Sequence, residues 1–144
     1  MNIEKDSLYR YNPEMAGARY SDATGVILSG GENKRIPITK GFIRIGGSSI
    51  ISRQIGVLME LFGHVMLITN KPRDYVHLRV PMFGDVIDKR GPIVGIYTAL
   101  LNSKSDWIFV VACDMPFINP NLIRYMASKR EGYDAVVPIY SKRI

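Results

Sequence analysis

The sequence predicts an α/β fold, a doubly wound and mostly parallel sheet with helices on both faces. Short apolar runs alternate with longer amphipathic stretches from Thr24 onward, which is typical of strands separated by helices. Such strands pair in parallel, because each crossover helix returns the chain to the same end of the sheet. Glycine or polar residues follow several of the apolar runs directly. Those residues would lie at the carboxyl ends of the strands, where sheets of this class bind ligands.

Length and composition indicate one folded domain with a polar N-terminal extension. The chain has 144 residues, of which 47% are hydrophobic and 22% are charged. Both values are ordinary for a soluble globular protein. Residues 1–23 are polar, contain tyrosines and lack the apolar core of a signal peptide, so we assign the domain to residues 24–144.

Charge and cysteine usage narrow the choice of partners. The net charge of +6 is spread along the chain and favours an anionic small molecule such as a nucleotide. We find no nucleic-acid-binding motif, and no apolar stretch approaches the roughly 20 residues of a membrane span. The single Cys113 excludes an intrachain disulfide and fits a reducing, cytoplasmic location.

The first part of the domain predicts two strands. Residues 26–28 are apolar throughout, as expected of a strand that is buried on both faces. Residues 42–45 alternate between apolar and polar side chains, which predicts a second strand. A Gly-Gly pair at residues 46–47 is expected to end this second strand in a turn.

A helix and a further strand are predicted next. Ser48 is a favourable N-cap, and apolar residues at helical spacing predict a helix that runs to about residue 61. Gly63 is expected to end this helix. Residues 64–68 predict the next buried strand, and Pro72 is a favoured first residue for a short helical turn.

The second half of the chain continues the alternation. We interpret residues 85–88 as the end of a strand, and the Gly-Pro pair at residues 91–92 as the start of a helix over residues 93–102. The most apolar predicted strand covers residues 107–112. The remaining elements are a helix at residues 120–129, capped by Asn119, and a strand at residues 135–137.

A glycine turn and spaced cations follow the first predicted strand. Gly30 and Gly31 would let backbone N–H groups approach phosphate oxygens closely. Arg35 and Lys40 supply positive charge, although a solvated surface is the alternative role for both. The pattern is neither the Walker loop nor G-x-G-x-x-G. We interpret the segment as a phosphate-binding loop of another type.

Three polar residues follow other predicted strands. Asp114 comes directly after the most apolar strand, and it either offers oxygen ligands to Mg²⁺ or caps a turn before the next proline. Asp88 is either a ligand or a loop residue. Asn70 carries hydrogen-bond donors and an acceptor, so it either contacts a base or ribose or forms a turn. We expect these residues and the glycine turn to converge at one edge of the sheet.

Four segments of the chain match one known set of patterns. They are LSGGENKRIPITKGF, with Gly-Gly-x-x-x-Arg; the strand end ITN; VIDKRGPIVGIYTAL, with an aspartate before Gly-Pro; and WIFVVACDMPFINPNLI, with Asp-Met-Pro-Phe. Together with DAVVP, these segments resemble the molybdenum cofactor guanylyltransferase family of nucleotidyltransferases. The resemblance spans residues 24–144 and corresponds to the N-terminal part of a typical family member.

The resemblance implies an activity and a set of site residues. The implied fold is that of the nucleotide-diphospho-sugar transferases, which is Rossmann-like. The implied reaction transfers GMP from GTP to molybdopterin and releases pyrophosphate, with Mg²⁺ as the cofactor. By position, the implied nucleotide-binding residues are Leu28, Gly30, Gly31, Lys40, Asn70 and Asp88. The implied catalytic residues are Lys40, Arg35 and Asp114, of which Asp114 is the metal ligand.

The chain departs from the family pattern in the loop and at its end. Pro37 replaces a glycine of the signature and removes a backbone N–H, and Thr39 stands where the family often has an acid. The chain stops at Ile144, whereas family members usually continue into the acceptor-binding half. A short sheet leaves apolar edges, which a second copy would cover, so we expect a homodimer.

Two alternative functions stay open. One is a related nucleotidyltransferase that acts on another phosphorylated acceptor, such as a sugar phosphate. The other is a catalytically impaired relative that only binds nucleotide. Pro37 and the short C-terminus favour the impaired relative, whereas the retention of Asp114 and Lys40 argues against it.

Overall fold

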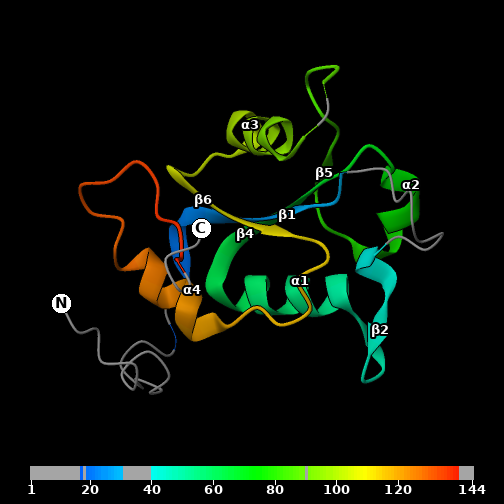
Figure 1. Ribbon diagram of the computed structural model, residues 1–144, viewed down its shortest axis with the longest axis horizontal. Helices are drawn as coiled ribbons and strands as arrows, with labels where there is room; N and C mark the ends of the chain where they lie inside the picture. Colours follow the sequence, from blue (N-terminus) through cyan, green and yellow to red (C-terminus); the bar gives the residue numbers. More distant parts are fainter. Residues whose placement is uncertain (1–16, 18, 31–39, 90, 140–144) are drawn as a thin grey trace. The chain divides into compact units, whose positions relative to one another are not determined.

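The computed structural model describes residues 17, 19–30, 40–89 and 91–139, and for Lys40 the backbone only (Figure 1). The chain divides into two compact units, Arg19–Ile118 and a second formed by Met1–Ala18 with Asn119–Ile144. The first unit contains the sheet and three of the helices.

The described residues form a parallel sheet of four strands in the order β5-β4-β1-β6. The strands are β1 (Tyr20–Leu28), β4 (Phe62–Ile68), β5 (Met82–Phe83) and β6 (Trp107–Ala112). The central strand β1 pairs with both β4 and β6. Parallel pairing requires crossover connections, and helices α1 (Ile50–Leu61), α2 (Pro72–Tyr75) and α3 (Pro92–Asn102) lie in them.

Helices cover both faces of the sheet, which confirms the predicted doubly wound fold. Figure 1 shows α1 (Ile50–Leu61) on one face and α3 (Pro92–Asn102) on the other. Helix α1 begins after Ser49, whose side chain accepts a hydrogen bond from the backbone N–H of Ser52. Helix α3 begins after Gly91, whose φ of 136° favours glycine, with Pro92 in its first turn.

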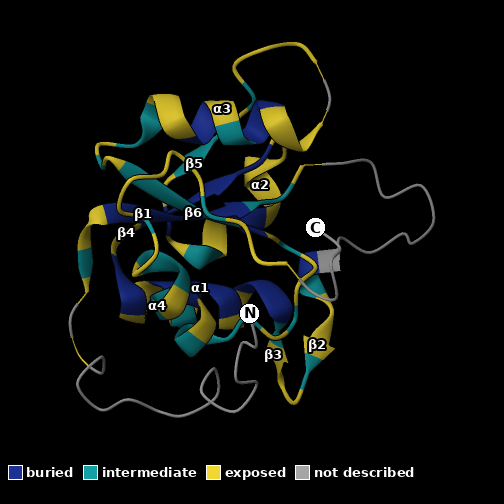
Figure 2. Ribbon diagram, turned by 60° about the vertical axis from the view of Figure 1, so that its left-hand side comes forward, coloured by how far each residue is buried: buried dark blue, intermediate teal, exposed yellow. Residues whose placement is uncertain are grey.

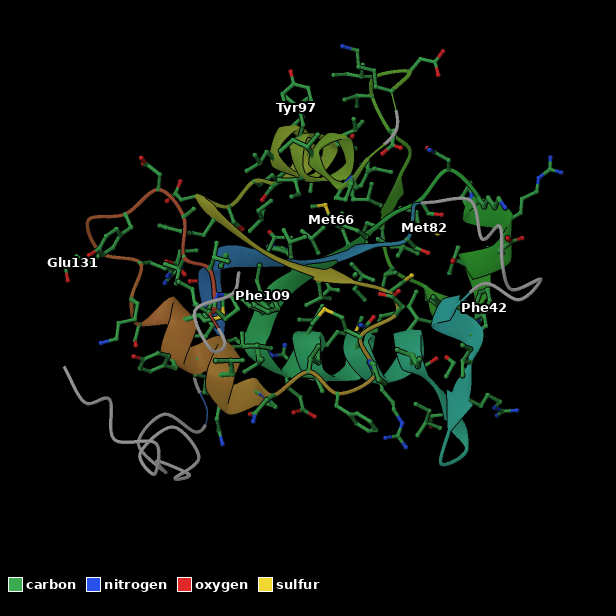
Figure 3. The ribbon with its side chains drawn as sticks, in the orientation of Figure 1. Phe42, Met66, Met82, Tyr97, Phe109 and Glu131 are labelled. Atoms are coloured by element: carbon green, nitrogen blue, oxygen red, sulfur yellow. The ribbon has the colours of Figure 1, made fainter. Side chains whose placement is uncertain are left out.

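The core lies on both sides of β1. Much of β1 is buried (Figure 2). Its Val26 and Ile27 are completely buried, as predicted for a strand with helices on both faces. On the α3 side, Val26 packs with Met66, Ile68 and Ala99 (Figure 3). On the α1 side, a Cβ added at Gly25 would lie 3.2 Å from Leu58 Cβ, so the missing side chain lets α1 approach the strand closely.

Residues 42–45 do not form the predicted strand. They belong to the 3-10 turn η2 (Lys40–Phe42) and to a short hairpin of β2 (Arg44–Ile45) and β3 (Ser48–Ser49). Gly46 and Gly47 make the predicted turn with φ values of 57° and 87°. Because Ser48 pairs in β3, the helix cap moves from the predicted Ser48 to Ser49.

Two further boundaries differ from the prediction. Helix α1 ends where β4 begins, so Gly63 lies within a strand and does not end the helix. The strand that follows β4 in the sheet is β5 at Met82–Phe83, and the predicted strand end at residues 85–88 is instead irregular, with a bend at residues 86–88. Between β4 and β5 lie α2 (Pro72–Tyr75), which begins at the predicted proline, and the 3-10 turn η3 (Val76–Leu78).

The second unit contains α4 (Pro120–Ala127). Asn119 caps this helix as predicted, since its side chain accepts hydrogen bonds from the backbone of Asn121 and Leu122. Residues 135–137 form no strand, because their apolar side chains meet no strand partner and β-propensity alone does not make a ladder. Among the described residues, no helix is long and apolar enough to cross a membrane.

Candidate active site at the carboxyl edge of the sheet

The carboxyl ends of the four strands are level. Leu28 of β1 lies opposite both Ile68 of β4 and Ala112 of β6, and Ile68 lies opposite Phe83 of β5. Backbone hydrogen bonds continue this register one residue further, from Ser29, Thr69 and Cys113 to the carbonyls of Ile68, Phe83 and Leu28 respectively. The residues two positions past the strand ends are therefore Gly30, Asn70, Asp85 and Asp114.

Asp114 lies in a tight turn that α1 holds in place. The backbone N–H of Met115 donates to the carbonyl of Ala112, which closes a turn over residues 112–115. The buried amide Nε2 of Gln54 donates to the carbonyls of Ala112 and Met115, at 2.8 Å each. Asp114 is an exposed residue, so this fixed turn lies at the surface of the sheet edge.

The segment that carries Lys40 packs directly against this turn. A Cβ built on the buried Gly41 would lie 3.5 Å from Cys113 Cβ and 3.6 Å from the Cys113 carbonyl oxygen. A Cβ alone would make ordinary contacts there, but a side chain larger than that of alanine would press the two segments apart. Lys40 directly precedes Gly41, and Asp114 directly follows Cys113. The contact between Gly41 and Cys113 therefore places the two predicted catalytic residues on adjacent backbone segments.

An aromatic contact ties the same segment to the first residue after β1. Phe42 stacks on the buried Tyr75 of α2, with ring centroids 4.9 Å apart (Figure 3). The Tyr75 hydroxyl is hydrogen-bonded to Ser29 Oγ, one residue before Gly30. Both ends of the predicted phosphate-binding loop are thus anchored to α2.

Asn70 and Asp85 form a reciprocal pair at the other end of the edge. The side-chain oxygen of Asn70 accepts from the backbone N–H of Asp85, and its Nδ2 donates to Asp85 Oδ2, both at 2.8 Å. These two bonds fix which way the amide of Asn70 faces. Among the residues that the structure describes, one N–H and one lone pair of this amide have no partner.

The loop after β5 is hydrogen-bonded to α3 near its start, and its later residues are exposed. The backbone N–H of Val86 donates to the buried hydroxyl of Thr98 on α3. Asp88 lies five residues past Phe83 and is exposed. It therefore does not lie at a strand end as predicted, and Asp85 takes that position.

Leu28 is held between the sheet and α3. A Cβ on Gly95 would lie 3.1 Å from Leu28 Cδ2 and 3.7 Å from Ile68 Cγ2, so the glycine lets α3 approach the strand ends. Leu28 also offers its backbone carbonyl to Cys113. Its side chain is thus part of the packing that positions the edge.

Of the predicted site residues, the strand register brings Gly30, Asn70 and Asp114 to one edge. No described atom lies within 4 Å of a Cβ built on Gly30, and its φ is not positive, so the described fold gives no steric reason for glycine there. Gly31, Arg35 and the Lys40 side chain lie outside the described residues, as do Pro37 and Thr39.

Sequence reasoning missed Asp85 and Gln54. Asp85 follows a strand of only two residues, which is too short to produce a periodic signal. Gln54 is a polar residue within the apolar face of α1, and this break in the pattern was the available signal.

The sequence profile of the MobA-like NTP transferase domain matches residues 25–144. The chain belongs to this family. Over 122 residues it is 39% identical to a probable molybdenum cofactor guanylyltransferase of Pelotomaculum thermopropionicum, an alignment that covers 85% of this chain and 60% of that protein. The chain thus spans about three fifths of the length of the curated relatives it matches first.

Solved structures show the same fold at lower identity. A CMP:2-keto-3-deoxy-manno-octonic acid synthetase complexed with CTP is 18% identical, with a TM-score of 0.65 over 75% of this chain and 46% of that one. A Mycobacterium tuberculosis protein in complex with manganese is 16% identical, with a TM-score of 0.55 over 75% of this chain and 59% of that one. These similarities support the nucleotidyltransferase-like architecture of this MobA-like domain.

The donor chemistry of the edge suits a hard divalent cation. Within the described ranges, no three histidine, cysteine or acidic side chains gather into a metal-binding cluster. Asp114 nevertheless places a carboxylate on an exposed residue of a turn that Gln54 holds. Mg²⁺ is commonly held by one or two carboxylates together with substrate phosphates and water. The residues present in this MobA-like domain therefore fit Mg²⁺ bound together with a nucleotide.

Proposed function

We propose that this domain binds GTP and transfers its GMP moiety to molybdopterin, with release of pyrophosphate. The observation that carries the proposal is the level edge of the sheet, where the register brings Gly30, Asn70 and Asp114 together. The choice of GTP and molybdopterin rests on the guanylyltransferase relative, which shares 39% identity.

The proposed roles divide the edge into a phosphate half and a base half. In the phosphate half, Leu28, Gly30 and Gly31 lie against the triphosphate, and Lys40 and Arg35 neutralise its charge. In the base half, Asn70 and Asp88 contact the guanosine. The hydrogen bonds of Asp85 to Asn70 support this division, because they fix the orientation of the amide that would contact the base.

Asp114 is the proposed Mg²⁺ ligand. When bound there, Mg²⁺ would supply charge neutralisation at the α-phosphate and at the pyrophosphate leaving group. The acceptor phosphate of molybdopterin is already anionic, so the chain needs no general base. The bond formed joins an acceptor oxygen to the α-phosphorus, and the bond broken releases pyrophosphate. The task of the protein is to align the acceptor and the leaving group.

Calorimetric titration with GTP, ATP and CTP, each with and without Mg²⁺, tests the proposal. We expect Mg²⁺-dependent preference for GTP that is lost in Asp114→Ala. Lack of binding to any of the three nucleotides would rule out the proposed function. If GTP binds but GMP is transferred to a sugar phosphate and not to molybdopterin, the acceptor assignment is wrong. If GTP binds and neither acceptor reacts, the domain is a nucleotide-binding relative.

Two further parts of the proposal concern the setting of the domain. We propose that it acts in the cytoplasm, where its single cysteine stays reduced. We also propose that two copies associate, because α3 exposes the apolar residues Ile93, Tyr97 and Leu101. Tyr97 points away from the sheet (Figure 3). Sedimentation equilibrium at micromolar concentration checks this association, and a monomer would contradict it.

A further inference from the structure

We infer that Gln54 is a positioning residue for the carboxylate of Asp114. This inference rests on the proposed role of Asp114 in holding Mg²⁺. Gln54 lies on α1, 60 residues earlier in the sequence, and it does not itself reach the ligand in the arrangement we propose. It acts by fixing the turn from which Asp114 projects.

The contacts of Gln54 bracket Asp114. Its Nε2 donates to the carbonyl of Ala112, the last residue of β6, and to the carbonyl of Met115, the residue after Asp114. The backbone N–H of Met115 also donates to the Ala112 carbonyl across the turn, at 3.2 Å. The two bonds of 2.8 Å from Gln54 therefore hold the turn on both sides of Asp114.

The chemistry of the contact requires an uncharged group with two donors. A primary amide nitrogen carries two N–H groups and can serve both carbonyls at once. A glutamate would place acceptor oxygens against the same carbonyls, and a leucine would leave both without this partner. A lysine would bring a charge into a fully buried position at a large desolvation cost. Glutamine is thus specific for this arrangement.

Helix α1 holds this amide rigidly. Gln54 is completely buried, and Ile51, Ile55 and Leu58 of the same helix are buried around it. The Ser49 cap fixes the start of the helix. The amide donor of Gln54 lies on a packed helix and bonds to an exposed turn. It therefore restricts the movement of that turn at the sheet edge.

The acceptor end of Gln54 supports a role beyond packing. Among the described residues, none donates a hydrogen bond to its buried Oε1. A buried acceptor without a partner is unfavourable, and a leucine of similar size would avoid that penalty. Holding the Asp114 turn gives a reason for a glutamine at this core position.

Binding of Mn²⁺, used as a probe for the proposed Mg²⁺ site, tests the inference. We would measure Mn²⁺ affinity by electron paramagnetic resonance in the presence of GTP, and GTP affinity by calorimetry in EDTA. For Gln54→Leu we expect about 10-fold weaker Mn²⁺ binding or more, as for other residues that orient metal ligands. We expect metal-free GTP affinity within about twofold of the wild type, since the phosphate loop is unchanged.

Two further variants separate positioning from stability and from the proposed function. Ile55→Val on the same helix is the matched control, which should cost about 1 kcal/mol of stability and leave Mn²⁺ affinity unchanged. Asp114→Asn reports on the proposed function: if it too leaves Mn²⁺ affinity unchanged, Asp114 is not the ligand. If Asp114→Asn weakens Mn²⁺ and folded Gln54→Leu does not, Gln54 has no positioning role.

A second substitution covers the case in which Gln54→Leu does not fold. Gln54→Met keeps the length and flexibility of the side chain and removes both donors. The same loss of Mn²⁺ affinity is expected, and excess Mn²⁺ should restore nucleotide complex formation. Wild-type Mn²⁺ affinity in folded Gln54→Met would overturn the inference. If this variant also fails to fold, hydrogen exchange of the side-chain N–H groups of Gln54 is measured in the wild type. Slow exchange with solvent supports the two buried hydrogen bonds, and rapid exchange contradicts them.

Discussion

The two halves of the sheet edge hold their polar groups in different ways. At the β1–β6 half, a completely buried amide from α1 fixes the turn of Asp114. At the β4–β5 half, Asn70 and Asp85 are themselves near the surface and hold each other. The first half is positioned by the core, and the second by a pair of side chains. Changes at the second half should therefore affect binding with little cost in stability, whereas changes to the buried groups that hold the first half should affect both.

The largest effect is expected for Asp114→Asn. Removal of the carboxylate charge should lower the rate of Mg²⁺-dependent GMP transfer by about 100-fold or more, because electrostatic stabilisation of the transferred group would be lost. Unfolding in urea should be little changed, since the side chain is exposed. Initial rates with saturating GTP measure the effect. A variant with wild-type rates would show that this half of the edge is not the metal site.

The next largest effect is expected for Gly41→Val. Its side chain would clash with Ile51 and Cys113, whose Cβ atoms lie 3.4 and 3.5 Å from the Cβ position. We expect a loss of about 2 kcal/mol in the free energy of unfolding, typical of overpacking, together with weaker nucleotide binding. Gly41→Ala is the matched control, because its single methyl group makes ordinary contacts. Equal stability of the two variants in urea would contradict the close packing described above.

A smaller effect is expected for Asn70→Ala. Loss of the two hydrogen bonds to Asp85 should cost about 1 kcal/mol of stability or less, since the pair is near the surface. GTP affinity should fall more than stability does, and calorimetry beside urea unfolding compares the two. If Asp85→Ala weakens GTP binding as much as Asn70→Ala, the orientation of the amide is the important property. If Asp85→Ala has no effect, the pair does not position the base contact.

The smallest effect is expected far from the edge, at Gly56→Ala. Gly56 lies on the exposed side of α1, and no described atom lies within 4 Å of its Cβ position. The substitution should stabilise the domain by about 0.5–1 kcal/mol through helix propensity. Thermal unfolding measures the gain, and GTP affinity should stay the same. Destabilisation would mean that α1 has less room than described.

The sequence predicted the parts of the site in which a long apolar strand precedes a polar residue. Leu28 and Ala112 end such strands, so Gly30 and Asp114 were placed correctly at the edge. The prediction at Asp88 was wrong in position, because Val86 and Ile87 look like a buried strand but are 49% and 42% exposed. The true strand at Met82–Phe83 has two residues, and only the sheet beside it identifies it.

The contacts between distant segments could not be predicted. Gln54 and Ala112 are 58 residues apart, and no local pattern links them. The need for a small residue at Gly41 follows only from the structure, in which Cys113 packs beside it. The helix caps were predicted to within one residue, because caps depend on a few neighbouring residues. Features that depend on neighbouring residues could therefore be predicted from the sequence, and contacts between distant segments could not.

The level strand ends have a consequence for folding. Gly30, Asn70, Asp85 and Asp114 are joined by sheet register and not by neighbouring sequence. The site therefore forms only after the crossovers have closed, and a ligand there recognises the folded chain and not the unfolded one. By mass action, a nucleotide at 100 times its dissociation constant would stabilise the domain by about 2.7 kcal/mol. The melting temperature of the domain thus becomes an assay for its ligand that needs neither the acceptor nor turnover.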